Sequence, residues 1–303
     1  MRIGIDLGGT KIEGVLMDRA GRIRERRRRP TPVAAGYGAI LSAICDLVAE
    51  LEQTAGRECP VGIGTPGALS AHNNTLKNSN TVCMNGRPVK ADLEERLNRL
   101  LRIENDANCF ALSEALDGAA QGYGMVFGVI MGTGVGGGLV HHRVLHAGLQ
   151  HIAGEWGHNI LVPGGRQCYC GRHGCVETYL SGPGLMCTWR EVTGSTEAPS
   201  PQTIAERTDA GESDAGRVMD QFLQNFGQAL SVVINILDPD AVVIGGGLSN
   251  IENLYVPGRE YVARYVFNDE LRTPILKNCH GDSSGVRGAA QLWPPDGTNP
   301  SVP

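Results

Sequence analysis

The sequence contains no apolar run that reaches the ~18 residues of a membrane-spanning helix, and its opening residues lack a secretory signal pattern. It also lacks an excess of positive charge, because 27 Lys and Arg stand against 32 Asp and Glu, a net charge of −5. Nucleic-acid-binding proteins usually carry a basic face, whereas the basic run at residues 22–29 is typical of an exposed edge strand. These absences predict a cytoplasmic protein that binds neither a membrane nor nucleic acid.

The spacing of a Walker phosphate loop, Gly-x4-Gly-Lys-Ser/Thr, is also absent. Glycine itself is abundant, with 42 of 303 residues. The glycines cluster after apolar strands, at residues 8–9, 132–138 and 245–247. Because glycine lets a phosphate approach the backbone closely, this clustering predicts backbone that contacts phosphate and argues against flexible linkers.

The first glycine pair lies in residues 6–11, Asp-Leu-Gly-Gly-Thr-Lys, at the end of a predicted strand. Gly8 and Gly9 would let a phosphate approach, and the hydroxyl of Thr10 adds a hydrogen-bond donor. The carboxylate of Asp6 could hold a magnesium ion through water. An ordinary hairpin turn explains this stretch equally well when it is taken alone.

Two further glycine runs follow apolar strands. Residues 132–138 form a second turn of the phosphate-contacting type, for which a glycine-rich bulge between strands is the alternative. Residues 245–247 suit a nucleotide base or ribose, although a closely packed strand-to-helix turn would use the same residues. Two phosphate-type turns in one chain favour a nucleotide site more strongly than either turn does alone.

The spacing of apolar residues predicts an α/β chain in two domains. Residues 1–120 contain an antiparallel meander and then alternating helices and strands. The order strand, glycine turn, strand recurs in residues 121–284, as a weak internal repeat. A last helix is predicted at about 285–293 and a disordered tail at 294–303. The predicted strands are 2–7, 12–17, 22–29, 59–64, 101–104, 125–131, 139–142 and 241–244, and the other predicted helices are 37–55, 92–100, 106–120, 182–192, 202–209, 214–237 and 254–266.

A carboxylate begins the predicted helix at 106–120. Phosphoryl transfer to an alcohol needs a group that takes the hydroxyl proton, and Asp106 is the candidate for this general base. A helix N-terminus stabilises the ionised form of a carboxylate, which is the form that a base requires. Asn and Asp also favour the N-cap position, so either Asn105 or Asp106 could serve only as the cap of this helix.

The densest group of metal-ligating side chains lies in residues 158–175. His158, Cys168, Cys170 and Cys175 offer one imidazole and three thiolates, a full tetrahedral set for structural zinc with no open position. The spacing Cys-x-Cys-x4-Cys is tighter than the usual Cys-x2-Cys pair. The interleaved glycine turns nevertheless favour a metal site over three unrelated thiols.

Two carboxylates, Glu155 and Glu177, flank these four metal-ligating residues. A bound metal would hold both glutamates rigidly, and each could then accept hydrogen bonds from sugar hydroxyls. His158 could use its second ring nitrogen in the same way while it binds zinc. The alternative for either glutamate is a solvated carboxylate or one that supports the zinc ligands.

Taken together, these residues resemble the ROK family of sugar kinases, within the actin-like ATPase superfamily. The resemblance extends over residues 3–293, and its motifs are residues 6–11, 104–108, 132–138, 154–158, 168–177 and 245–247. It implies two α/β domains of ribonuclease-H type, with ATP and a sugar bound in the cleft between them. It also implies that the last helix returns to the first domain.

The family resemblance assigns roles to individual residues. Asp106 is the implied catalytic base. The implied sugar ligands are Gly67, Asn80 (or Asn78), Asn105, Glu155, His158 and Glu177. The implied phosphate contacts are Gly9, Thr10, Lys11, Thr133 and Gly134, in turns that also contain Asp6, Gly8 and Gly132, and the implied adenosine contacts are Gly246 and Gly247.

Within the family, residues 77–86, 153–159 and 280–290 resemble bacterial fructokinases of the manno(fructo)kinase type. Residues 105–114 and 133–139 are equally similar to N-acetylglucosamine kinases. The sequence therefore predicts an ATP- and magnesium-dependent hexose kinase that phosphorylates a primary hydroxyl. Fructose is the leading substrate, and N-acetylglucosamine or glucose is the alternative.

Two alternatives to an active enzyme follow from the same resemblance. ROK transcriptional repressors carry a winged helix-turn-helix before the strand that here begins at Ile3, so a regulator is disfavoured. A catalytically dead sugar sensor is disfavoured because Asp106 is intact. The resemblance also implies a homodimer.

Overall fold

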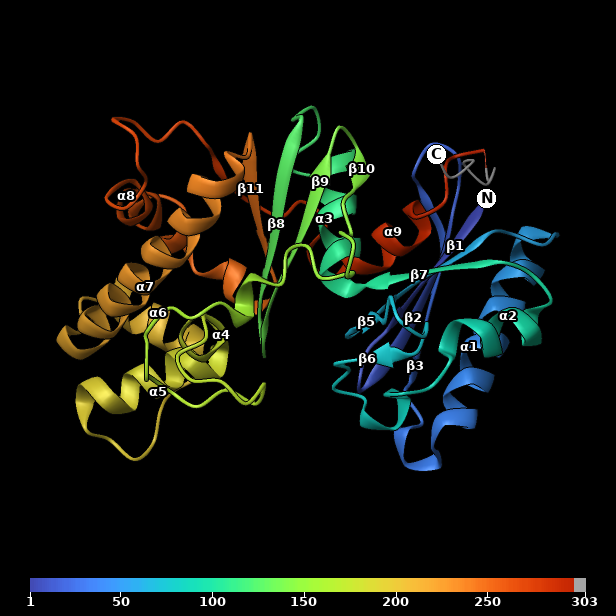
Figure 1. The fold of residues 1–303 in the computed structure, drawn as a ribbon, viewed down its shortest axis with the longest axis horizontal. Helices are drawn as coiled ribbons and strands as arrows, with labels where there is room; N and C mark the ends of the chain where they lie inside the picture. Colours follow the sequence, from blue (N-terminus) through green and yellow to red (C-terminus); the bar gives the residue numbers. More distant parts are fainter. Residues whose placement is uncertain (297–303) are drawn as a thin grey trace.

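In a computed structural model of the chain, which describes residues 1–296, two lobes are each built on a five-stranded sheet (Figure 1). The strand order in the first sheet is β3-β2-β1-β4-β7. Strand β1 pairs antiparallel with β2 and parallel with β4, and β4 pairs parallel with β7. The bounds are β1 Arg2–Leu7, β2 Lys11–Met17, β3 Ile23–Pro30, β4 Val61–Thr65 and β7 Leu101–Asn105.

The second sheet repeats the topology of the first, in the order β10-β9-β8-β11-β12. Strand β9 pairs antiparallel with β10 and with β8, whereas β8, β11 and β12 run parallel. The internal repeat predicted from the sequence is therefore confirmed as a repeat of strand order and direction. The bounds are β8 Met125–Met131, β9 Val135–His141, β10 Val144–Leu145, β11 Ala241–Gly245 and β12 Ile275–Lys277, and a separate pair is formed by β5 Ala68–Leu69 and β6 Leu76–Lys77.

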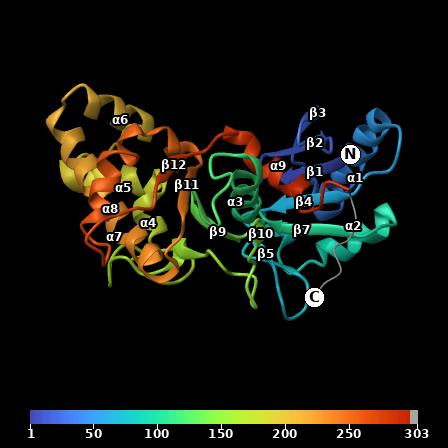
Figure 2. The ribbon, with the colours of Figure 1, turned by 90° about the horizontal axis from the view of Figure 1, so that it is seen from above.

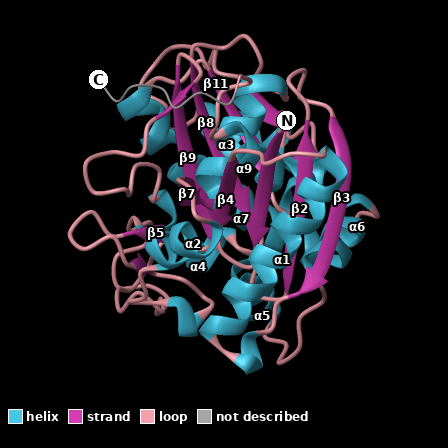
Figure 3. Ribbon diagram, turned by 90° about the vertical axis from the view of Figure 1, so that its right-hand side faces the viewer, coloured by secondary structure: helices cyan, strands magenta, loops and turns pink. Residues whose placement is uncertain are grey.

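Helices cover the sheets of both lobes (Figures 2 and 3). In the first lobe, Ile3 and Ile5 of β1 pack in one core with the apolar face of α1, Tyr37–Ala55. The intervening Gly4 faces α9, Ser284–Gln291, whose backbone a Cβ at Gly4 would strike. This alternation follows from the two-residue period of a strand. As the resemblance implied, the last helix thus returns to the first sheet.

The second sheet is covered by α7, Ser213–Leu237, on one face and by α3, Asp106–Asp117, on the other. Val129 packs in the core that includes α7, whereas Val126 packs with residues of α3. Because α3 lies against this sheet, the domain boundary proposed at residues 120–121 stays a prediction. Among residues 1–296, no helix is both long and apolar enough to cross a membrane.

Helices α3 and α9 lie side by side between the lobes (Figure 1). Their backbones approach so closely that a Cβ at Gly288 would lie 1.7 Å from the carbonyl oxygen of Cys109. Glu114 of α3 is fully buried and accepts hydrogen bonds from the Cys279 backbone at 3.0 Å and from the Ser284 hydroxyl at 2.7 Å. The helix pair and this carboxylate therefore join the end of the second lobe to the first.

The predicted edge strand is confirmed. Strand β3 lies at the edge of the first sheet, and its side chains alternate between half-buried and exposed. Two of its arginines, Arg26 and Arg28, pair with Glu13, whose carboxylate is buried on the neighbouring strand. The basic run thus neutralises a buried acid as well as protecting an edge.

Two predicted elements differ from the observed ones. Residues 135–138 were expected in a glycine turn, but they belong to β9. Their glycines are needed for packing, because a Cβ at Gly138 would lie 2.8 Å from the Ala107 carbonyl oxygen of α3. The helix expected at 254–266 is a short α8, Pro257–Ala263, which Pro257 opens. The other helices are α2 Val89–Leu97, α4 Glu177–Leu180, α5 Gly182–Thr193 and α6 Pro201–Asp209. Residues 297–303 of the predicted tail lie outside the described residues.

The close crossing of α3 and α9 generates a test. Gly288→Ala should lower the free energy of unfolding by about 3 kcal/mol, because the added methyl meets backbone that cannot rotate away. Gly216→Ala is the matched control, since a Cβ there meets nothing within 4 Å. That variant should be more stable by about 0.5–1 kcal/mol, as expected for Gly to Ala inside a helix. Equal stability of Gly288→Ala and the wild type in chemical denaturation would contradict the observed packing.

Candidate active site

The parallel strands of the first sheet bring polar residues to one edge. Asp6, the last residue but one of β1, is in register with Gly64 of β4, and Thr65 is in register with Asn105 of β7. Gly285, at the start of α9, lies against the Asp6 carboxylate, because a Cβ there would be 3.6 Å from Oδ2. The carboxyl ends of three strands and the beginning of α9 therefore meet at Asp6.

The N-cap of α3 is Asn105, which resolves one alternative left by the sequence. Asn105 has extended backbone dihedrals, and its Oδ1 accepts a hydrogen bond from the Ala107 N–H at 2.9 Å. Its Nδ2 donates to the carbonyl oxygen of Gly67, also at 2.9 Å. Asp106 occupies the first helical position, so its carboxylate is not needed as the cap. The two implied sugar ligands Gly67 and Asn105 are brought together.

Two carboxyl groups at this edge have raised pKa values. Burial is the main cause for Asp106, and the negative charge of Glu155 adds to it, so that its pKa rises to about 6 although the Ala107 N–H opposes the shift. Burial also raises the pKa of Asp6 to about 7, with contributions from Asp106 and Glu13. The structure thus places these four acids, drawn from both lobes, within electrostatic reach of one another.

Thr31 stabilises the first glycine turn through two hydrogen bonds. The Thr31 hydroxyl donates to the Gly8 carbonyl oxygen at 2.7 Å, and its N–H donates to the Thr10 carbonyl oxygen at 3.0 Å. Within residues 1–296, the backbone N–H groups of Gly9 and Thr10 have no hydrogen-bond acceptor. The turn therefore presents two free N–H groups, as a phosphate site requires. Lys11 lies 3.9 Å from the Glu13 carboxylate.

The second glycine turn also leaves two backbone N–H groups without acceptors among the described residues. The Gly132 N–H donates to the Gly134 carbonyl oxygen at 2.9 Å, and in the described part of the chain the N–H groups of Thr133 and Gly134 have no acceptor. The third glycine run lies beside this turn, because a Cβ at Gly246 would be 2.4 Å from the Met131 carbonyl oxygen. Gly246 has a φ of 79°, which a residue with a side chain rarely adopts. The implied phosphate and adenosine contacts are therefore neighbours.

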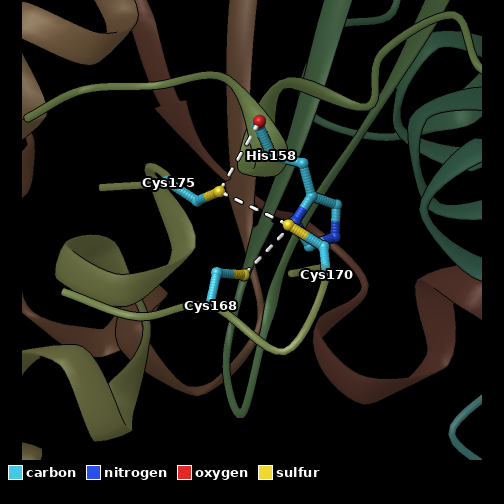
Figure 4. A group of neighbouring side chains, drawn as sticks. All are labelled: His158, Cys168, Cys170 and Cys175. Carbon is cyan, nitrogen blue, oxygen red and sulfur yellow. Dashed lines mark hydrogen bonds between the residues drawn. The ribbon is translucent and has the colours of Figure 1, made fainter. Parts of the chain in front are cut away.

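The four predicted metal ligands converge (Figure 4). The ligand atoms of His158, Cys168, Cys170 and Cys175 all lie within 4.8 Å of one another. Nδ1 of His158 is 3.7 Å from Sγ of Cys168, and Sγ of Cys170 is 3.6 Å from Sγ of Cys175. A regular tetrahedron with zinc–sulfur and zinc–nitrogen bonds of about 2.3 and 2.0 Å has edges of about 3.6–3.8 Å. The donor set and its spacing fit zinc.

The second ring nitrogen of His158 is not free. Nε2 lies 3.1 Å from the hydroxyl of Tyr169, and the two rings meet edge to face with centroids 5.3 Å apart. A metal on Nδ1 would leave the proton on Nε2, which would then donate to Tyr169. Burial is the main cause of the raised pKa of Tyr169, and the negative charges of Glu177 and Glu155 add to it, so that the pKa rises to about 12. Tyr169 therefore lies among the implied sugar ligands.

The predicted sugar ligands are brought together only in part. Asn78, Glu155 and His158 line one cavity of about 510 Å³. Asn80 lies near the first glycine turn, since a Cβ at Gly9 would be 3.8 Å from its Oδ1. Another cavity, about 990 Å³, lies along β7 and the end of α9 and is lined by none of the predicted site residues.

Three site residues were missed from the sequence. Tyr169 stands between two metal-ligating cysteines, which was a usable signal that its side chain lies close to the site. Glu13 faces Asp6 across the first hairpin, and the hairpin register would have indicated it. Thr31 offers no signal, because it follows the arginine run and reaches the turn only through the pairing of β3 with β2.

Comparison with known proteins shows relatives that match almost the entire chain. The ROK family matches residues 2–295. N-acetyl-D-glucosamine kinase of Escherichia coli O157:H7 is 40% identical over 303 residues, which cover 96% of this chain and 99% of that protein. The protein of the same name from Salmonella heidelberg (strain SL476) gives the same identity and coverage.

Solved structures match over a similar extent. ROK hexokinase from Thermus thermophilus has a TM-score of 0.85 and 31% identity, covering 95% of this chain and 96% of its own. A ROK family glucokinase from Streptomyces griseus, in complex with glucose and AMPPNP, has a TM-score of 0.79 and 30% identity. The match covers 96% of this chain and 98% of that structure's chain. These matches confirm the predicted α/β fold of two actin-like, ribonuclease-H-type domains. The chain belongs to the ROK family.

Proposed function

We propose that this protein is an ATP-dependent hexosamine kinase that transfers the γ-phosphoryl group to the primary hydroxyl of N-acetylglucosamine. The observation that carries this proposal is that Asp106, the first residue of α3, lies within electrostatic reach of Asp6, whose strand leads into a turn with free backbone N–H groups, in a chain that is 40% identical to N-acetyl-D-glucosamine kinase. The sequence favoured fructose and kept N-acetylglucosamine as the alternative. The relatives give no support to fructose, so the alternative becomes the leading substrate.

Asp106 is the proposed general base. Asn105 takes over the capping role. Asp106 shares the Ala107 N–H through Oδ1, which leaves Oδ2 to accept the proton of the sugar hydroxyl. Its raised pKa of about 6 makes it a stronger base than an ordinary aspartate, while most of it remains ionised at pH 7. Phosphoryl transfer otherwise depends on positioning and on neutralising charge, which the turns supply.

The nucleotide would lie across the two glycine turns. Gly9, Thr10, Thr133 and Gly134 are proposed to donate backbone hydrogen bonds to phosphate oxygens. Lys11 would add a positive charge, and Gly246 with Gly247 would lie under the adenosine. Asp6 would hold the magnesium ion through water, and the ion would supply charge neutralisation at the phosphates.

The sugar would lie between Asp106 and the four metal-ligating residues. Glu155 and Glu177 are proposed as hydroxyl ligands from the second lobe, and Gly67 with Asn80 from the first. His158 would join them only where a sugar hydroxyl replaces the Tyr169 hydroxyl at its Nε2. Asn105 has one Nδ2 hydrogen left beyond its bond to Gly67, so it can still donate to a hydroxyl. A homodimer and a cytoplasmic location remain part of this proposal.

Zinc is proposed to be structural. Four protein ligands complete a tetrahedral shell and leave no position for water or substrate, so the metal would not take part in the reaction. Its effect would be to fix residues 155–177 beside Asp106.

A panel of hexoses tests the substrate. N-acetylglucosamine should give the highest kcat/KM with ATP and magnesium, because the relative with 40% identity carries that name. Fructose, mannose and glucose are the comparison sugars, measured by coupled ADP release. A preference for fructose would restore the original prediction, and no ADP release with any sugar would contradict the kinase proposal.

Replacement of the base tests the mechanism. Asp106→Asn should lower kcat by at least about 100-fold, because the amide cannot take a proton, while the sugar still binds in calorimetry. In the wild type, kcat/KM should fall as the pH drops through about 6, where the Asp106 carboxylate becomes protonated. A variant that keeps a tenth of the wild-type rate would show that Asp106 is not the base.

Metal content tests the zinc site. Protein purified without chelators should contain about one zinc per chain, and Cys175→Ser should lose it, because the Cys175 thiol is fully buried among the ligand atoms. Cys83→Ser, at a free cysteine of the other lobe, is the matched control and should keep the metal. Clearly less than one zinc in the wild type would argue against the site.

A further inference from the structure

One carboxylate connects the metal-ligating residues to the second glycine turn. Glu177 is the first residue of α4 and follows Cys175 by two positions. Its Oε2 accepts a hydrogen bond from the backbone N–H of Val135 at 2.9 Å. Val135 begins β9 directly after the turn at 132–134. The family resemblance implies Glu177 as a sugar ligand, but one oxygen of its carboxylate is already hydrogen-bonded to the backbone that follows the turn.

The turn is shaped to receive this carboxylate. A Cβ at Gly134 would lie 2.7 Å from Oε2 of Glu177, so glycine is required for the approach. On the other side, the N–H of Gly182 donates to the Gly132 carbonyl oxygen at 2.7 Å. The segment that follows the metal-ligating cysteines therefore holds both ends of the turn.

The direction of the hydrogen bond decides what this contact does. A carboxylate close to a phosphate would repel it, but here its oxygen faces the Val135 N–H, while the N–H groups of Thr133 and Gly134 stay without acceptors among residues 1–296. A carboxylate that accepts from a backbone N–H makes one of the stronger hydrogen bonds in proteins. It can therefore hold the turn while two donors remain available.

We propose that Glu177 is a positioning residue for the nucleotide, because it holds the second glycine turn in the shape that offers the Thr133 and Gly134 N–H groups to phosphate. The inference rests on the proposed kinase function. It separates Glu177 from Glu155 and His158, for which the described residues show no such contact with the turn. Nucleotide binding should then depend on Glu177 even when no sugar is present.

The test is the affinity of sugar-free protein for magnesium–AMPPNP, measured by calorimetry. Glu177→Ala should weaken binding about tenfold, the size expected for the loss of one hydrogen bond to a charged group. Glu177→Gln should remain within about threefold of the wild type, because its amide oxygen can still accept from Val135. Glu206→Ala, at an exposed carboxylate of α6, is the control and should bind like the wild type.

The outcomes separate the inference from the function on which it rests. Wild type that does not bind magnesium–AMPPNP would contradict the kinase proposal itself. A second outcome would overturn the inference. If the wild type binds magnesium–AMPPNP, the affinity of Glu177→Ala is unchanged and only its KM for sugar is raised, then Glu177 is only a sugar ligand. If Glu177→Ala does not fold, Glu177→Asp replaces it. That variant keeps the charge, withdraws the carboxylate from Val135 by one methylene, and should show the same loss.

Discussion

The hydrogen bond from the Ala107 N–H to the Asn105 side chain fixes the junction at which the proposed reaction would take place. It ends β7 of the first sheet and starts α3, which packs against the second sheet. The residue after the cap therefore lies where the two lobes meet. Asn105 also ties this junction to Gly67, so the cap, the backbone behind the proposed sugar and the base are held by one side chain. An alanine in place of Asn105 would leave the Ala107 N–H with only the carboxylate of Asp106 as its acceptor and would remove the bond to Gly67.

Glycine has two different uses in this chain, and only the place of each glycine in the fold shows which use applies. At Gly134 the missing side chain leaves room for a carboxylate, beside N–H groups that remain free. At Gly138 and Gly288 it lets two backbones touch, because a Cβ would lie 2.8 Å or less from a carbonyl oxygen. The close-packed glycines set the distance between α3, α9 and the second sheet.

The sequence was sufficient for features that depend on local spacing. The convergence of the candidate metal ligands from His158 to Cys175, the longer strands of both lobes and the repeat of strand, glycine turn and strand could be predicted, because each follows from residue type at short separation. The short strands β5, β6, β10 and β12 were not predicted. It was insufficient where a contact joins distant segments. Glycines 136–138 were assigned to a turn, since nothing local shows that α3 will lie on them. The choice of cap between Asn105 and Asp106 depended on backbone dihedrals, and the substrate depended on comparison with relatives.

Electrostatics suggests an order of events at the proposed site. Burial raises the pKa of both Asp6 and Asp106, and the charge of Asp106 adds to the rise at Asp6 as that of Glu155 does at Asp106, so the proposed base is least ionised when the site holds no cation. A magnesium ion brought in with the nucleotide would favour the ionised forms of Asp6 and Asp106. The proposed base, already mostly ionised at pH 7, would then become fully ionised once the phosphoryl donor is in place. A kinase needs such a sequence, because a sugar hydroxyl that loses its proton before the donor arrives has nothing productive to attack. The cluster of acids that lowers the ionised fraction of the proposed base in the empty site would therefore favour proton transfer only when sugar, nucleotide and magnesium are all bound.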